Sequence, residues 1–97
     1  MTIYCLERMS SSSPKKWRIT GPEATVTFGA KGYQDFTQHK DRERQERYLL
    51  RHRHNENWTK SGATTAGFWS RWLLWNKPSL AASIRDTKKR FGFQIHV

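Results

Sequence analysis

The sequence contains a single cysteine, Cys5, and this scarcity excludes one class of protein. No disulfide can form within the chain, so it is not a small secreted scaffold built on disulfides. No stretch approaches the roughly 20 apolar residues of a membrane-spanning helix, and the first residues lack the apolar run of a signal peptide. We therefore expect no membrane span and a location in the cytoplasm, in the nucleus or inside a particle.

Motifs of catalysis are missing as well. The chain contains no Gly-rich phosphate loop, nucleophile elbow or paired-carboxylate arrangement, and its four histidines and Cys5 match no recognised zinc spacing. We therefore expect no enzyme, no cofactor and no metal site. One loop nevertheless brings Asp35, His39 and Asp41 close together just before a basic helix. A nuclease-like accessory enzyme that uses them is the third of three functional hypotheses.

Acidic residues are scarce, whereas basic and aromatic residues are abundant. Eight Asp and Glu stand against 18 Lys and Arg, which leaves a formal net charge of +10. Such a field attracts nucleic acid, anionic membranes or acidic protein surfaces. Five Trp, five Phe and three Tyr can each bury a large apolar area. A chain of 97 residues suffices for one domain, and we expect a positive surface over an aromatic core.

The N-terminal part of the chain is predicted to hold an arm and a hairpin. Residues 1–16 read as a disordered, basic and Ser-rich arm, because the tract from Ser10 to Lys16 cannot build a core. Residues 17–20 and 24–28 alternate apolar and polar side chains around a Gly-Pro turn, which predicts a β-hairpin. Its inner face would carry Trp17, Ile19, Val26 and Phe28. Residues 29–39 would then form a loop that Tyr33 and Phe36 attach to the core.

The rest of the chain predicts about three helices. The first spans residues 40–54, supported by i,i+4 ion pairs. The second begins at Thr64 or Thr65 and runs to residue 76, and the third runs from a Ser79 cap to residue 91, where Gly92 ends it. Residues 93–97 alternate again and could add a C-terminal strand. Residues 17–97 are thus predicted to be a single small α+β domain, with the hairpin packed on the helices.

The tryptophans allow two interpretations. Trp58, Trp69, Trp72 and Trp75 could form a platform on which single-stranded bases stack, but aromatic residues at helical spacing are more often core. We expect most of them to be buried, with Trp69 or Trp75 as the candidate for an exposed interface residue. The predicted core comprises Val26, Phe28, Phe68, Trp72, Leu73, Leu80, Ile84 and Phe91.

A row of basic residues on the first helix is the sharpest functional signal. Lys40, Arg44, Arg47, Arg51 and His54 follow i, i+4, i+7, i+11 and i+14, which places them on one helical face. Such a row matches phosphates along a nucleic-acid groove. The alternative is a solvated helix whose charge is balanced by nearby glutamates, but these lie off the row. Further candidate contacts are Lys15, Lys16, Lys88, Lys89 and Arg90.

Two local motifs carry resemblances. Ser13-Pro14-Lys15-Lys16 resembles the Ser-Pro-basic-basic units of linker-histone tails, which bind the minor groove of DNA. The block Gly67-Phe68-Trp69-Ser70-Arg71-Trp72-Leu73-Leu74-Trp75, within residues 28–92, resembles a family of small uncharacterised basic proteins of large double-stranded DNA viruses of algae and protists. The family resemblance implies a viral gene product, located in the host cytoplasm, nucleus or viral factory or carried in the virion. It implies no particular activity.

Two other functional hypotheses rank above the hypothesis of a nuclease-like enzyme. The first is a small basic viral protein that binds nucleic acid, expected to be double-stranded DNA, non-specifically through the basic helix face. The second is a structural protein, such as a minor capsid or scaffold component, whose partner is an acidic viral protein. The net charge and the basic row favour the first.

Overall fold

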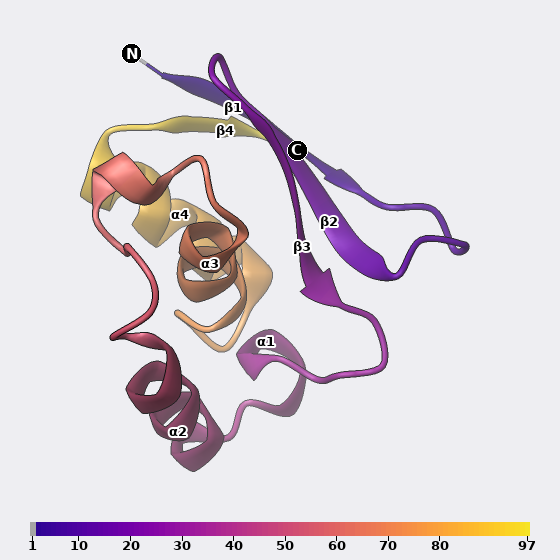
Figure 1. Cartoon of the computed structure of the whole chain (residues 1–97), viewed down its shortest axis with the longest axis vertical. Coiled ribbons are helices and arrows are strands. Elements are labelled where there is room, and N and C mark those ends of the chain that lie inside the picture. Colours follow the sequence, from indigo (N-terminus) through magenta and orange to yellow (C-terminus); the bar gives the residue numbers. More distant parts are fainter. Residues whose placement is uncertain (1) are drawn as a thin grey trace.

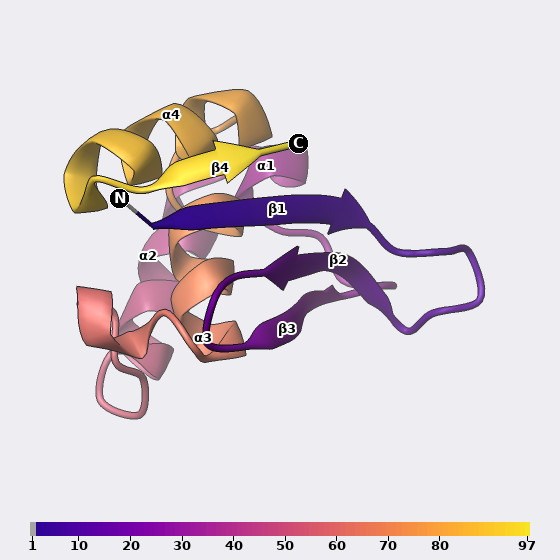
Figure 2. The ribbon, with the colours of Figure 1, turned by 90° about the horizontal axis from the view of Figure 1, so that it is seen from above.

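The computed structural model describes residues 2–97 as a four-stranded sheet with helices on one side (Figure 1). Its strands are β1 (Ile3–Arg8), β2 (Lys15–Thr20), β3 (Thr25–Ala30) and β4 (Gln94–His96). They lie in the order β3-β2-β1-β4, and β4 runs parallel to β1 whereas the other neighbours are antiparallel (Figure 2). The fold is therefore α+β, as predicted, and the C-terminal strand is present.

β1 corrects the prediction that residues 1–16 form a disordered arm. The strand pairs with β2 on one side and with β4 on the other, so it lies inside the sheet. Tyr4 and Leu6 point into the core. The Ser-rich tract is the connection between two strands, closed by a hydrogen bond from the Met9 amide to the Lys16 carbonyl (2.9 Å). The polar composition of this tract is compatible with a turn as well as with disorder. The strand before it is short, and it was included in the predicted arm because it adjoins this polar tract.

The predicted hairpin is confirmed as β2 and β3. Trp17 pairs with Phe28 and Ile19 pairs with Val26, so the four side chains share one face. Trp17, Ile19 and Phe28 are buried, and Val26 is partly buried against the core.

The helical part confirms three predicted helices and adds short turns. Asp41 accepts from the Glu43 and Arg44 amides at the start of α2 (Arg42–His52). Ser79 accepts from an amide at the start of α4 (Leu80–Phe91), and Gly92 ends α4 at φ 71°. The elements are α1 (Phe36–His39), α2 (Arg42–His52), the 3-10 turn η1 (Lys60–Gly62), α3 (Ala66–Trp69), its π-helical continuation η2 (Ser70–Leu74) and α4 (Leu80–Phe91).

The core lies between the sheet and the α3, η2 and α4 segment. Of the predicted core residues, Phe28, Phe68, Trp72 and Leu73 are buried, whereas the other four are partly buried and pack against them. Trp69 is fully buried, so only Trp75 remains of the two proposed interface tryptophans. Among residues 2–97, no helix is both long and apolar enough to cross a membrane.

The loop before α1 differs from the prediction at one position. Phe36 is buried as expected, but Tyr33 is 76% exposed and does not attach the loop to the core. That task falls to Lys16, whose ammonium group donates to the Tyr33 carbonyl and to Asp35, each at 2.7 Å. The loop is therefore held by Lys16, through the Tyr33 carbonyl and the Asp35 side chain, while the Tyr33 ring stays exposed.

Candidate functional site

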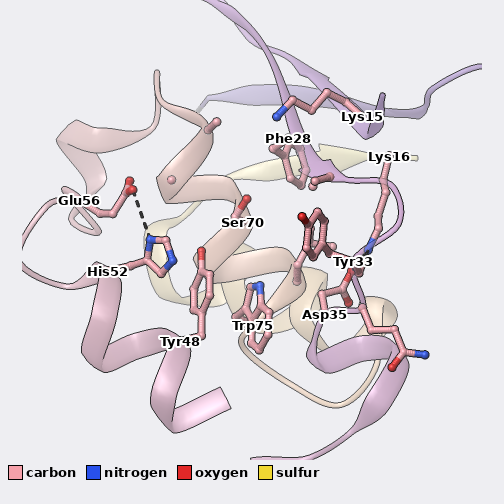
Figure 3. Close-up of a pocket in the computed structure, with 16 residues that line it drawn as sticks. Lys15, Lys16, Phe28, Tyr33, Asp35, Tyr48, His52, Glu56, Ser70 and Trp75 are labelled. Atoms are coloured by element: carbon pink, nitrogen blue, oxygen red, sulfur yellow. Dashed lines mark hydrogen bonds and ion pairs between the residues drawn. The ribbon is translucent and has the colours of Figure 1, made fainter. Parts of the chain in front are cut away.

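A cleft of about 420 Å³ opens between β3, α2 and the α3–η2 segment (Figure 3). This volume falls within the range of roughly 300–1,000 Å³ that is usual for small-ligand sites. Phe28 and Leu74 supply an apolar part of its lining, and the exposed Tyr33 stands at one side. We call this space the aromatic cleft, defined by Phe28, Tyr33, Tyr48, His52, Ser70 and Trp75.

Three closely packed rings, of which two are stacked, form one wall of the aromatic cleft. Tyr48 and Trp75 lie parallel, with centroids 4.2 Å apart and an interplanar angle of 2°. His52, one helical turn after Tyr48 on α2, covers the other side of Tyr48 at 4.3 Å. Burial, with a further contribution from Glu56, raises the pKa of Tyr48 to about 12, so its hydroxyl keeps the proton at neutral pH.

Polar atoms are directed toward the middle of the aromatic cleft. Figure 3 shows the hydroxyl groups of Tyr33, Tyr48 and Ser70 turned toward this space, and the indole nitrogen of Trp75 points the same way. The indole N–H can only donate, whereas the hydroxyls can donate or accept. The aromatic cleft therefore offers several hydrogen-bonding groups within a mainly aromatic lining.

One carboxylate, that of Glu56, lies at the edge of this site. Its Oε1 is 3.8 Å from His52 Nδ1 (Figure 3), and its side chain lies against Gly67. A Cβ atom on Gly67 would lie 1.4 Å from Glu56 Oε2, so no other residue type allows this approach without a shift. Glu56 therefore adds a hydrogen-bond acceptor to the edge of the aromatic cleft.

Three arginines of α2 lie next to the aromatic cleft. Arg44, Arg47 and Arg51 line a shallow hollow of about 230 Å³, and this hollow shares Tyr33 and Trp75 with the aromatic cleft. Their spacing along α2 places them on one face, as the sequence predicts. Arg47 lies 3.8 Å from Glu43 in an exposed pair, which contributes little. Among residues 2–97, neither Arg44 nor Arg51 forms an ion pair. We call these three residues the basic α2 face.

Lys40 and His54 do not belong to this face, which corrects the predicted row of five. Lys40 has a φ of 57° and ends α1, so it lies before α2. Its ammonium group donates to the carbonyl oxygens of Thr37 and Pro78. His54 lies in the turn after α2 and accepts only a long bond of 3.4 Å from Arg53. The helix is shorter than predicted because Asp41, and not an earlier residue, caps it.

Lys15 and Lys16 are adjacent in sequence but differ in role. The Lys16 ammonium group is used by the Tyr33 carbonyl, Asp35 and Gln38, each at 2.7 Å. Lys15 is exposed and lies along the rim of the aromatic cleft (Figure 3). Only Lys15 of the pair therefore offers its charge to a ligand.

The third predicted basic group lies elsewhere. Lys88, Lys89 and Arg90 form the last turn of α4, where positive charge stabilises the end of the helix. Arg90 pairs with Asp86 at 3.3 Å and covers the Trp72 ring at 4.6 Å. Figure 1 shows this end of α4 beside the sheet and apart from α2, so the two basic groups lie on different parts of the fold.

Asp35, His39 and Asp41 serve the starts of two helices. Asp35 caps α1 and pairs with Lys16, and Asp41 caps α2. His39 Nδ1 accepts from the Asp41 amide at 2.9 Å, and burial lowers the pKa of His39. Within residues 2–97, no three His, Cys, Asp or Glu side chains are close enough together to hold a metal ion. The structure thus gives these three residues roles in shaping the backbone.

Several residues of the cleft were missed at the level of sequence. Tyr48 and His52 are spaced i, i+4 and could have marked a second face of the first helix, whereas Glu56 lies beyond the end of that helix. Tyr33 follows Gly32 in a polar loop, and an aromatic residue in that setting can be exposed. No feature of the sequence marks Ser70 as a cleft residue, because only the packing of η2 turns its side chain toward the cleft.

Comparison with known proteins adds one match. Residues 8–52 match a family of unknown function, DUF5754. This stretch includes Tyr33, Tyr48 and the basic α2 face but ends before Trp75. No curated protein and no solved structure matches the chain. The matched family has no stated source or activity, so the resemblance to a viral family stays a prediction.

Proposed function

We propose that the protein binds nucleic acid non-specifically, with the basic α2 face on the phosphate backbone. The observation that carries this proposal is the hollow on α2 lined by Arg44, Arg47 and Arg51. A guanidinium group is planar and always charged, and it binds phosphate oxygens in pairs. Arg44 and Arg51 form no ion pair among residues 2–97, so their charge is available for a ligand.

The net charge of +10 also supports nucleic-acid binding, through long-range electrostatic attraction. A surplus of this size speeds the encounter with a polyanion. Lys15 adds a fourth cation on the rim of the aromatic cleft, which shares Tyr33 and Trp75 with the arginine hollow. Contacts to three or four phosphates predict a slope of about −3 when the logarithm of the binding constant is plotted against that of the salt concentration.

A mobility-shift titration on duplex DNA, from low to physiological salt, tests the proposal. We expect a steep loss of affinity with salt in the wild type. The triple variant Arg44→Gln, Arg47→Gln, Arg51→Gln should lose most binding at every salt concentration. Its matched control is Arg85→Gln, Lys88→Gln, Lys89→Gln, which removes the same charge from exposed positions of α4. The control should bind more tightly than the α2 variant.

Two results would contradict the proposal. Absence of binding by the wild type at low salt would overturn the function itself. An equal loss in the two triple variants would show that total charge, and not the basic α2 face, sets the affinity. Circular dichroism on all three proteins checks that the fold is retained.

A further inference from the structure

We infer that the aromatic cleft takes one unpaired base of a nucleic-acid strand whose phosphates lie on the basic α2 face. This inference rests on the proposed function and names its ligand more closely. The aromatic cleft and the arginine hollow meet at Tyr33, Gln34 and Trp75, which line both. A nucleotide joins an aromatic base to a charged phosphate, so one nucleotide can occupy both spaces at once.

Tyr33 provides a ring on which a base can stack. Its side chain is 76% exposed, although an aromatic ring gains most from burial. The loop beneath the ring is not loose, because Lys16 bonds to the Tyr33 carbonyl, to Asp35 and to Gln38. The exposed ring is thus presented by a braced backbone and loses little freedom on binding. Stacking of bases on such rings is typical of proteins that bind single strands.

The shape of the site favours an unpaired base over a duplex. The cleft is enclosed by β3, α2 and η2, and its polar groups lie inside it (Figure 3). In a duplex, the faces of a base are stacked and its pairing edge is occupied. Only a base that has left the stack can bring its ring beside Tyr33 and its edge to these groups.

The polar groups predict which bases bind best. Glu56 lines the aromatic cleft beside Gly67 and 3.8 Å from His52, and its carboxylate can only accept hydrogen bonds. Cytosine, adenine and guanine carry an amino group that can donate to it, whereas the corresponding edge of thymine carries a carbonyl oxygen. The Trp75 indole N–H, which can only donate, also faces the aromatic cleft and is a partner for a ring nitrogen or carbonyl (Figure 3). We therefore expect cytosine to be preferred over thymine.

The first experiment compares labelled oligo-dC with a duplex of equal length by fluorescence anisotropy at low salt. The wild type should bind the single strand more tightly. Tyr33→Ala should weaken single-strand binding about tenfold and leave duplex binding almost unchanged. Tyr33→Phe is the matched control, since it keeps the ring and should keep the affinity. Because Tyr33 is exposed, we expect both variants to keep the fold, and circular dichroism checks this.

The outcomes separate this inference from the proposed function. If Tyr33→Ala binds the single strand as well as the wild type does, or if the duplex is bound more tightly, the inference is overturned while nucleic-acid binding stands. If the wild type binds neither ligand at low salt, the proposed function fails and the inference falls with it.

The second experiment measures base preference with oligo-dC and oligo-dT. The wild type should favour oligo-dC, and Glu56→Gln should bring the ratio of the two affinities toward one, because the amide can donate as well as accept. Equal affinity of the wild type for the two strands would overturn the role of Glu56. His96→Gln, which changes an exposed residue on β4, serves as the unrelated control.

Discussion

Helices α2 and α4 are similar in length and both are basic, yet they play different parts in the molecule. α2 spans 11 residues and buries only Tyr48, whereas α4 spans 12 and buries Ser83 and Thr87. Thr87 donates to the Trp72 carbonyl at 3.1 Å, which joins α4 to η2. The cations of α2 lie beside an open hollow. The two helices therefore differ in what surrounds their cations, because Arg90 of α4 is paired with Asp86 whereas Arg44 and Arg51 of α2 border the hollow.

Arginines at aromatic rings show the same contrast. Arg90 of α4 and Arg71 of η2 both lie over the Trp72 ring, at 4.6 and 4.1 Å from its centroid. Such contacts stabilise the cation and the ring together, so these two guanidinium groups belong to the structure. The α2 arginines share their hollow with Tyr33 and Trp75 but are not engaged in a comparable ring contact within residues 2–97.

The largest expected effect on stability comes from removing a buried side chain that packs against α4. Phe68→Ala should lower the free energy of unfolding by about 3–5 kcal/mol, because Phe68 is 0% exposed and contacts Phe91 with ring centroids 5.1 Å apart. Leu50→Ala on α2 is the matched control and should change stability by less than about 0.5 kcal/mol, since Leu50 is 58% exposed. Urea denaturation measures both. Similar losses would show that α2 is packed as firmly as α4.

A smaller effect should follow from removing the helix caps. Asp41→Ala and Ser79→Ala each remove a side-chain acceptor at a helix start, at a cost of about 1 kcal/mol. Amide hydrogen exchange should rise throughout α2 in the first variant, because few buried contacts hold that helix. In Ser79→Ala, the rise should stay within the first turn of α4. Exchange that spreads equally along both helices would remove the distinction between them.

The smallest effect concerns pH and the start of α2. Burial, reinforced by Arg44, lowers the pKa of His39 from its ordinary 6.5, against opposing contributions from Asp41 and Asp35. The folded state therefore binds protons less readily than the unfolded state. The stability due to neutral His39 is fully present above the unfolded pKa and is lost as the pH falls below about 6.5 and through the folded pKa.

Comparing wild type with His39→Gln isolates this contribution from the other histidines. Both proteins are unfolded by urea at pH values on either side of 6.5. The wild type should lose slightly more stability on acidification than His39→Gln does. Parallel pH profiles would contradict the predicted role of His39.

Helix ends and the hairpin could be predicted because the residues that determine them lie within a few positions of one another in the sequence. The Ser79 cap and Gly92 stop of α4 were both found from the sequence, and so was the pairing face of β2 and β3. The β1–β4 pairing was not, because it joins Ile3–Arg8 to Gln94–His96 across almost the whole chain. Without its partners, β1 is a short strand next to a Ser-rich turn and has no distinctive pattern of its own.

The candidate site was predictable only in part. The sequence places Arg44, Arg47 and Arg51 on one face, since helical geometry follows from spacing alone. The predicted row wrongly included Lys40. This residue has a left-handed backbone conformation because α1 ends there, and its spacing from Arg44 does not reveal that. The aromatic cleft joins side chains from β3, α2 and η2, and no local pattern brings these elements together.

The sequence by itself determined the α+β class, the hairpin, the three main helices and the strong positive charge, because these depend on composition and on neighbours within a few residues. The tertiary structure decided which cations are free. The ammonium group of Lys16 donates to Asp35, 19 residues away in the sequence, and that of Lys40 donates to the Pro78 carbonyl, 38 residues away. Whether a charge is satisfied depends on which distant groups come within hydrogen-bond reach, and chain folding alone sets those distances.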